Sequence, residues 1–399
     1  MDYLDNYLNF SNGKTSPSRN IDGKYKVFGS NGIIGSSDEC NSKARTIVIG
    51  RVGAYCGSVH FSEEECWITD NAISVSCKNE GEEYFWYYLL KSLDLNNFRT
   101  GSGQPLLNQS ILKSISINVP SEHIIRANIG VSLSIFDQKI ELNTQINQTL
   151  EQIAQTIFKS WFIDFDPVTA KAEAIAQGKT AQQANFSAMA VISGKTFEEL
   201  DRLQAEKPTE YQQLWELAEA FPSGFEGDIP KGWKIAKIED VIKKIPVGKK
   251  YSSKTVSSEG LVPVLDQGRS GLIGYHNDKA GVQASIEEPV IVFANHTCYM
   301  RLITYDFSAI QNVFAFIGKE TNVLWTYLAT IGKQEFTEYK GHFPDFLIKE
   351  IIVPNKELTE LLGKRVKPLF DKIAVNELEN KSLAETRDLL LPKLLSGEL

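Results

Sequence analysis

The chain has 399 residues, of which 42% are hydrophobic, 23% charged and 10% aromatic, and its formal net charge is -8. A chain of this length is too long to fold around a single hydrophobic core of ordinary size, so we expect two or three domains. The acidic balance excludes a uniformly basic face, and any nucleic-acid surface must be a local patch or be completed by a partner. No signal peptide and no apolar run of ~18 residues is evident, which predicts a cytoplasmic protein without a membrane partner.

The side chains that usually build catalytic and metal sites are scattered. Five cysteines include no CxxC pair and are interpreted as reduced thiols, and five histidines show no ligand spacing. Gly178-Lys179-Thr180 lacks the first glycine of a P-loop, and Asp166-Pro167 lacks the rest of an adenine-methyltransferase motif. The sequence therefore predicts no catalytic residue, no metal site and no cofactor bound by this chain.

Residues 1–120 are predicted to form a mixed α/β unit. Runs rich in β-branched residues at 46–49 and 71–75 alternate with turn clusters such as 29–32. A helix is predicted at 82–92, where Tyr84, Phe85, Tyr88 and Leu89 share one face.

Residues 121–163 carry apolar residues at steps of three and four, the pattern of one long helix. About 40 residues at ~1.5 Å each make a rod of roughly 60 Å. Asn143 and Asn147 interrupt the stripe, which favours one register against a specific partner helix.

Residues 355–399 repeat this stretch without a gap, with Phe370 matching Phe136 and Asp371 matching Asp137. A second helix of matched length is therefore the expected partner. Ile153 is expected in the same apolar stripe. The predicted seam consists of Leu133, Phe136, Ile140, Leu150, Ile157, Leu362, Val366, Phe370, Ile373, Leu383 and Leu394.

Residues 164–232 are predicted to be helical linker material without a core of its own. Stretches 171–176 and 197–220 are helix-prone, and Gly178 and Gly194 break them. A second domain is expected to start near Trp233, after a segment rich in Gly and Pro.

Residues 233–354 repeat the first unit, with insertions confined to loops. The matches are Val27-Phe28 with Val264-Leu265, Gly32 and Gly35 with Gly271 and Gly274, 47–49 with 290–292, Asn71 with Asn312, and Trp86 with Trp325. Two copies that share a scaffold but not loop sequences indicate one recognition task performed twice on different targets.

Two sets of loop residues are candidates for binding nucleic acid. Cations and hydroxyls suit phosphate oxygens, whereas base edges require side chains with paired donors and acceptors. The phosphate candidates are Lys14, Ser16, Arg19, Lys249, Lys250 and Lys254. The base-reading candidates are Ser30, Asn31, Arg51, Gln267, Arg269, Ser270, Asn295 and His296. For each residue, a turn, capping or solvated-loop role is equally open.

Three segments give the chain a family resemblance: QIAQTIFKSWFIDFDPV at 152–168, FPSGFEGDIPKGW at 221–233 and LPKLLSGEL at 391–399. With Gly29-Ser30-Asn31-Gly32, they resemble the specificity subunit of Type I restriction-modification systems, over essentially the whole chain. The resemblance implies an α+β fold with two α/β target recognition domains in tandem repeat. The domains, 1–120 and 233–354, are separated by two long helices, 121–163 and 355–399, that form an antiparallel coiled coil.

The resemblance also implies a non-catalytic role. Each repeat would read one half of a bipartite, asymmetric double-stranded DNA target, and the coiled coil would fix the spacer and dock two modification subunits. S-adenosylmethionine, ATP and Mg are expected on partner subunits, which methylate adenine or, as restriction subunits, translocate and cleave. The alternatives are a coiled-coil protein-protein scaffold whose repeats bind peptides, and a self-sufficient methyltransferase-nuclease, against which the missing motifs argue.

Overall fold

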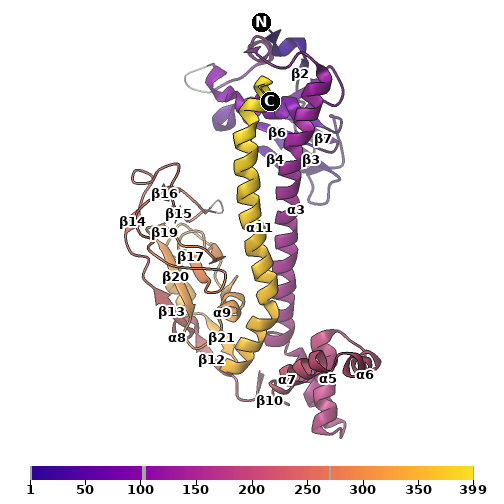
Figure 1. The fold of residues 1–399 in the computed structure, drawn as a ribbon, viewed down its shortest axis with the longest axis vertical. Coiled ribbons are helices and arrows are strands. Elements are labelled where there is room, and N and C mark those ends of the chain that lie inside the picture. Colours follow the sequence, from indigo (N-terminus) through magenta and orange to yellow (C-terminus); the bar gives the residue numbers. More distant parts are fainter. Residues whose placement is uncertain (1, 101–104, 269–270, 399) are drawn as a thin grey trace. The chain divides into compact units, whose positions relative to one another are not determined.

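The structure, a computed structural model, describes residues 2–100, 105–268 and 271–398 (Figure 1). The chain divides into two compact units, Met1–Thr144 with Glu377–Leu399, and Gln145–Asn376. Each unit contains one α/β domain and one end of each long helix, α3 (His123–Phe162) and α11 (Lys356–Ser396).

The α/β domain of the first unit is built from two small sheets and a strand pair. Its strands are β1 (Asp2–Tyr3), β2 (Leu8–Asn12), β3 (Tyr25–Gly29), β4 (Gly32–Ser37), β5 (Thr46–Gly50), β6 (Val59–Ser62), β7 (Cys66–Ile68), β8 (Ala72–Cys77) and β9 (Ser116–Ile117). Its helices are η1 (Leu4–Asn6), η2 (Gly53–Tyr55), α1 (Glu83–Ser92), η3 (Leu95–Phe98) and α2 (Gln109–Lys113). The sheet orders are β2-β8-β5-β6 and β4-β3-β7, with β3 parallel to β7, and β1 pairs with β9.

The second unit repeats this topology and has three additional strands. Its strands are β10 (Phe225–Glu226), β11 (Ile229–Pro230), β12 (Lys234–Lys237), β13 (Ile242–Ile245), β14 (Lys250–Tyr251), β15 (Val262–Leu265), β16 (Gly274–His276), β17 (Val290–Ala294), β18 (Met300–Ile303), β19 (Ser308–Ile310), β20 (Val313–Gly318) and β21 (Glu350–Val353). The short helices of this domain are α8 (Ile238–Val241), α9 (Val323–Thr330) and α10 (Phe343–Leu347). The orders β13-β20-β17-β18 and β14-β19-β15-β16, with β12 paired to β21, match the first unit except for the added β14. The tandem repeat predicted from the sequence is therefore confirmed.

The glycines of the hairpin from β3 to β4 show how closely the copies agree. Gly35 lies opposite Val27 with φ +153°, and Gly274 lies opposite Val264 with φ +147°. Side chains rarely adopt such φ values, which explains why glycine recurs at this place.

One part of the predicted alignment is wrong by one residue. Ile49 pairs with Ile73, two residues after Asn71, whereas Phe293 pairs with Phe314, two residues after Asn312. Ile49 therefore matches Phe293, and residues 47–49 match 291–293 rather than 290–292. Both β5 and β17 are buried along their whole length, so no alternation of polar and apolar residues marks the register in the sequence.

The predicted helix at 82–92 is confirmed as α1, which packs under the sheet of the first unit. Phe85 and Trp86 are fully buried. A Cβ atom on Gly130 would lie 2.4 Å from the Phe85 backbone nitrogen, so glycine lets α3 approach α1 closely. In the second unit Gly363, which is one position away from the match of Gly130, leaves room for the Asn322 side chain, since a Cβ atom there would lie 2.4 Å from it.

The two long helices run antiparallel within each unit (Figure 1). In the first unit the amide of Asn143 donates to Glu379 and Asn380, and Arg387 pairs with Asp137. The C-terminal end of α11 also enters the core there, where Leu395 is 5% exposed.

In the second unit the Asn376 amide donates to Asn147 Oδ1 at 2.7 Å. The asparagines that interrupt the apolar stripe therefore hydrogen-bond across the helix pair. Of the eleven seam residues, Leu133, Leu362, Val366 and Phe370 are buried and the others are half-buried, whereas Ile153 is 43% exposed and lies off the seam.

The residues between the repeats are helical, as predicted, and they join a core shared with the second domain rather than forming one of their own. Four helices form there: α4 (Asp166–Ala176), α5 (Ala181–Ser193), α6 (Phe197–Glu206) and α7 (Pro208–Glu219). Ala184, Ala188, Met189, Leu200 and Leu217 are buried, and all but Ala184 belong to the hydrophobic cluster that also contains Trp233 and Trp325. The predicted helix at 197–220 is two helices because Pro208 cannot donate the hydrogen bond that would continue α6.

Candidate nucleic-acid interface

Three turns of the first domain meet at one edge of its sheets, after β3, after β5 and between β7 and β8. The Arg51 backbone N–H donates to the Asn71 carbonyl oxygen at 2.9 Å. The Ser30 hydroxyl donates to the same oxygen at 2.5 Å and accepts from the Val52 backbone N–H at 3.3 Å. Together these bonds fix the three turns in one surface.

The second domain builds the same surface from the matching positions. The Asn295 backbone N–H donates to the Asn312 carbonyl oxygen at 2.9 Å, as Arg51 does to Asn71. The His296 backbone N–H donates to Gln267 Oε1 at 2.8 Å, as Val52 does to Ser30. The framework is thus duplicated, while the side chains at equivalent positions differ.

The base-reading candidates of the first domain differ in exposure. Asn31 is exposed, whereas Ser30 is half-buried and engaged within the surface. Arg51 is half-buried; its Nη1 donates to the Asp70 carbonyl oxygen at 3.3 Å, and its Nε is buried without a partner among the described residues.

In the second domain, Asn295 points inward. Its side chain is 8% exposed, and Oδ1 accepts the Phe343 backbone N–H at 2.8 Å, which caps the start of α10. His296 places Nδ1 2.8 Å from the Lys340 carbonyl oxygen, so Nδ1 carries the proton and Nε2 accepts from the Asn312 amide at 3.1 Å. Gln267 is half-buried, and Arg269 and Ser270 lie outside the described residues.

The predicted phosphate contacts fall into a free and an engaged group. Lys14, Ser16, Lys250 and Lys254 are exposed, and the three lysines make no ion pair within the described part of the chain. In the first copy Lys14 forms an isolated parallel β-bridge with Thr69, and in the second copy β14, which contains Lys250, pairs with β19. These backbone contacts place one lysine in each copy beside the turn that precedes Asn71 or Asn312.

Arg19 and Lys249 are engaged within the protein. Arg19 Nη1 donates to the Ile34 carbonyl oxygen at 3.0 Å. Lys249 lies 2.8 Å from Asp278; the hydrogen bond between them raises the pKa of Lys249 and lowers the pKa of Asp278. A phosphate would have to compete with Asp278, although an exposed pair of this kind is weak.

One aromatic residue at this surface was not predicted from the sequence. Tyr339 is 85% exposed, and its ring stacks on His296 with centroids 5.0 Å apart. The two residues are far apart in the sequence and share no motif, so only the fold brings them together.

Features of other functional classes are missing from the described residues. Within 2–100, 105–268 and 271–398, no group of three His, Cys, Asp or Glu side chains is placed to hold a metal ion. Over the same residues, no helix has the length and apolar character needed to cross a bilayer.

Comparisons with known proteins agree with this architecture. Residues 5–152 match the family described as the Type I restriction modification DNA specificity domain. The specificity subunit of the Type I restriction enzyme HindI from Haemophilus influenzae is 33% identical over 355 residues, covering 80% of this chain and 75% of that protein. The MjaIX specificity subunit from Methanocaldococcus jannaschii is 25% identical, covering 79% and 68%.

The fold is shared with a solved structure. The S subunit of a Type I restriction-modification system from M. genitalium superimposes with a TM-score of 0.56 at 17% identity, covering 99% of this chain and 95% of that one. The predicted fold class is confirmed by this match and by the paired topologies above. The identity and coverage of the H. influenzae relative, together with the family match over residues 5–152, establish that this chain belongs to the DNA specificity subunits of Type I restriction-modification systems.

Proposed function

We propose that each α/β domain reads one half of a bipartite, asymmetric DNA target and so directs the other subunits to it. The observation that carries this proposal is the duplicated turn surface with exchanged side chains. Where the first domain has Ser30 and Arg51, the second has Gln267 and Asn295. A constant frame with variable side chains is what two different half-sites require.

Phosphate contacts and base contacts have separate places on this surface. Lys14 and Lys250 lie beside the turns and suit phosphate oxygens, which position a protein without reading sequence. Asn31, Gln267 and His296 lie on the turns themselves, and Tyr339 stacks on His296 from the segment between α9 and α10; these four are our candidates for contact with base edges. Asn295 supports this surface from below.

The long helices have two roles in this proposal. They set the spacer between the half-sites, and they dock two modification subunits, with restriction subunits joining the complex in the cytoplasm. S-adenosylmethionine, ATP and Mg are bound by those partners, and this chain performs no chemistry.

The test is to co-express the chain with its modification subunit and map methylated adenines by single-molecule sequencing. We expect a bipartite motif with a fixed gap, and replacement of residues 233–354 by the same region of a homologue should change one half only. Gln267→Ala should relax the same half, with Lys231→Ala, an exposed residue in the turn before the domain, as the matched control. If the subunits co-purify but no bipartite motif appears, the chain is a protein-protein scaffold and this proposal is wrong.

A further inference from the structure

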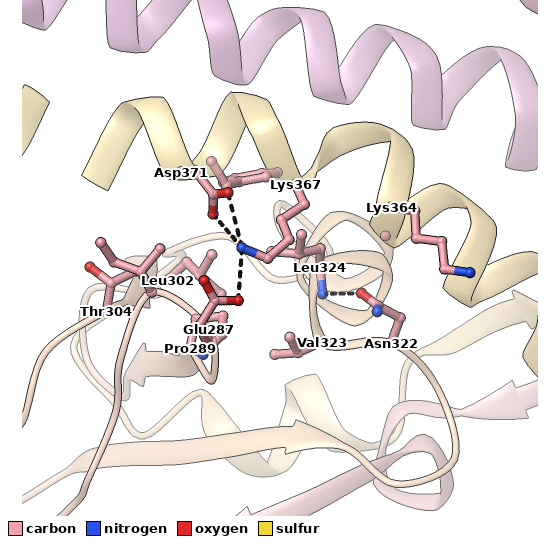
Figure 2. A pocket seen from close by; sticks show the side chains of 13 residues that line it. Glu287, Pro289, Leu302, Thr304, Asn322, Val323, Leu324, Lys364, Lys367 and Asp371 are labelled. Carbon is pink, nitrogen blue, oxygen red and sulfur yellow. Dashed lines mark hydrogen bonds and ion pairs between the residues drawn. The ribbon is translucent and has the colours of Figure 1, made fainter. Parts of the chain in front are cut away.

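The second unit contains a hollow between α9, α11 and the strand pair β17 and β18 (Figure 2). Its volume is about 130 Å³. Apolar walls come from Pro289, Leu302, Val323, Leu324 and Phe370. Figure 2 shows Thr304 at one side of the hollow, Val323 and Asn322 at the other, and Glu287, Lys367 and Asp371 meeting between them.

The same place in the first unit is filled by a tyrosine ring. Trp86 and Trp325 are matched and fully buried, so Tyr84, two residues before Trp86, corresponds to Val323. The Tyr84 ring packs on Phe61 with centroids 5.1 Å apart, and its hydroxyl donates to Glu63 at 2.7 Å. The Arg45 guanidinium lies 5.5 Å from the ring centroid.

Every one of these neighbours of Tyr84 has a counterpart that lines the hollow. Ile47 pairs with Phe61 in the first unit, and the matching Ile291 pairs with Leu302 in the second, which fixes the register. The resulting pairs are Phe61 with Leu302, Glu63 with Thr304, and Arg45 with Pro289. The hollow is therefore the tyrosine site of the first copy with the ring left out.

Size and charge restrict what can enter. A closed cavity of roughly 150 Å³ holds a benzene ring. This hollow is smaller, at about 130 Å³, but it is open at one side, so it admits at most one aromatic side chain. Lys367 is engaged by Asp371 at 2.8 Å and by Glu287 at 3.1 Å, while the exposed Lys364 at the rim makes no ion pair among the described residues. The two lysines balance the two carboxylates, so the lining carries no net charge, which suits an uncharged side chain.

We propose that this hollow receives a tyrosine side chain from the modification subunit. The aromatic ring that Tyr84 provides within the first copy would then come from a partner protein in the second copy. This rests on the proposed function, because α11 forms one wall of the hollow and is there proposed to dock that subunit. The phenol ring contacts Leu302, Leu324 and Phe370, and its hydroxyl bonds Thr304 as Tyr84 bonds Glu63.

The first experiment fills the hollow. Val323→Tyr restores the residue of the first copy, and we expect affinity of the full chain for the modification subunit to fall about tenfold or more. Val323→Thr has nearly the volume of valine, leaves the hollow open and is the matched control. Affinity is measured by calorimetry, and circular dichroism establishes that both variants are folded.

The second experiment uses p-cresol, the isolated side chain of tyrosine, on the full chain alone. We expect saturable shifts of the Leu302 and Leu324 methyl resonances that Val323→Thr retains and Val323→Tyr abolishes. Absence of saturable shifts in the unaltered chain, or equal affinity of the two variants for the modification subunit, overturns the inference. If the unaltered chain fails to assemble or to direct methylation while p-cresol still binds, the proposed function fails instead.

Discussion

At the scale of single residues, the most consequential contact is a buried ion pair at the start of α3. Arg126 and Glu82 lie 2.7 Å apart with side chains 2% and 0% exposed. Arg126 also donates to the carbonyl oxygens of Pro120 and Ser121, and Trp86 Nε1 donates to Glu82. One charge pair thus joins the long helix to the helix at the centre of the first domain.

Arg126→Met should lower the free energy of unfolding of the first unit by ~3–5 kcal/mol, because it leaves the Glu82 carboxylate buried without its partner. Urea unfolding followed by circular dichroism measures this. Lys139→Met, which removes the exposed pair with Glu379, is the control and should cost less than about 1 kcal/mol. A loss for Arg126→Met no larger than the control would contradict the account.

Lys171 gives the second residue-scale prediction. Its ammonium group donates to the Phe221 carbonyl oxygen at 2.7 Å, and burial lowers its pKa to about 8. In the unfolded chain Lys171 keeps its proton up to the ordinary lysine pKa of about 10.4. Between about pH 8 and 10.4 the unfolded state therefore binds more protons than the folded state. The contribution of Lys171 to the free energy of unfolding thus rises with pH over this range. The stability of the unaltered chain relative to Lys171→Met should therefore increase between pH 7.5 and 9.5. A difference that stays flat or falls over this range would show that the pKa is not lowered.

At the scale of elements, the long helices were predictable and the surface turns were not. Helix periodicity is local, and the gap-free match of Phe136 and Asp137 to Phe370 and Asp371 fixed both helices from the sequence. The turn surface depends on contacts such as Ser30 with Asn71 and His296 with Tyr339, which join distant segments. The sequence identified most turn residues of the candidate site but could not tell that Asn295 points inward, because an asparagine in a turn serves either purpose.

The element-scale prediction concerns spacer length. Inserting one heptad after Thr144 in α3 and one after Asn376 in α11 keeps both apolar stripes in phase and lengthens each helix by roughly 10 Å. We expect the gap of the methylated motif to grow by up to about 3 base pairs at ~3.4 Å each, while both half-sites stay the same. Methylation mapping checks this, and an unchanged gap in an active complex would exclude the helices as the ruler.

At the scale of the whole molecule, the net charge of -8 bears on how the chain meets DNA. Lys14 and Lys250 lie beside the recognition turns, but Lys249 is paired with Asp278 and Arg19 with a backbone oxygen. So few exposed lysines can displace only a few counterions from the DNA when the chain binds it. Most of the electrostatic attraction to DNA must therefore come from the partner subunits.

The chain alone should therefore distinguish target from non-target duplex by less than about tenfold, whereas the complex with modification subunits should bind its target tightly and with strong salt dependence. Fluorescence anisotropy at two salt concentrations, with a scrambled duplex of equal length as control, measures both. Tight, sequence-specific binding by the chain alone would show that the partners are not required for attraction.

The packing of Leu395 in the first unit has a consequence for biosynthesis. Leu395 is part of the core that also contains Leu4 and Trp86, so that core remains incomplete until residue 395 has left the ribosome. Residues 145–376 form an uninterrupted unit and need no later segment. Residues 145–376 can therefore complete their folding before the first unit does. The N-terminal domain remains partly folded until the residues around Leu395 are available.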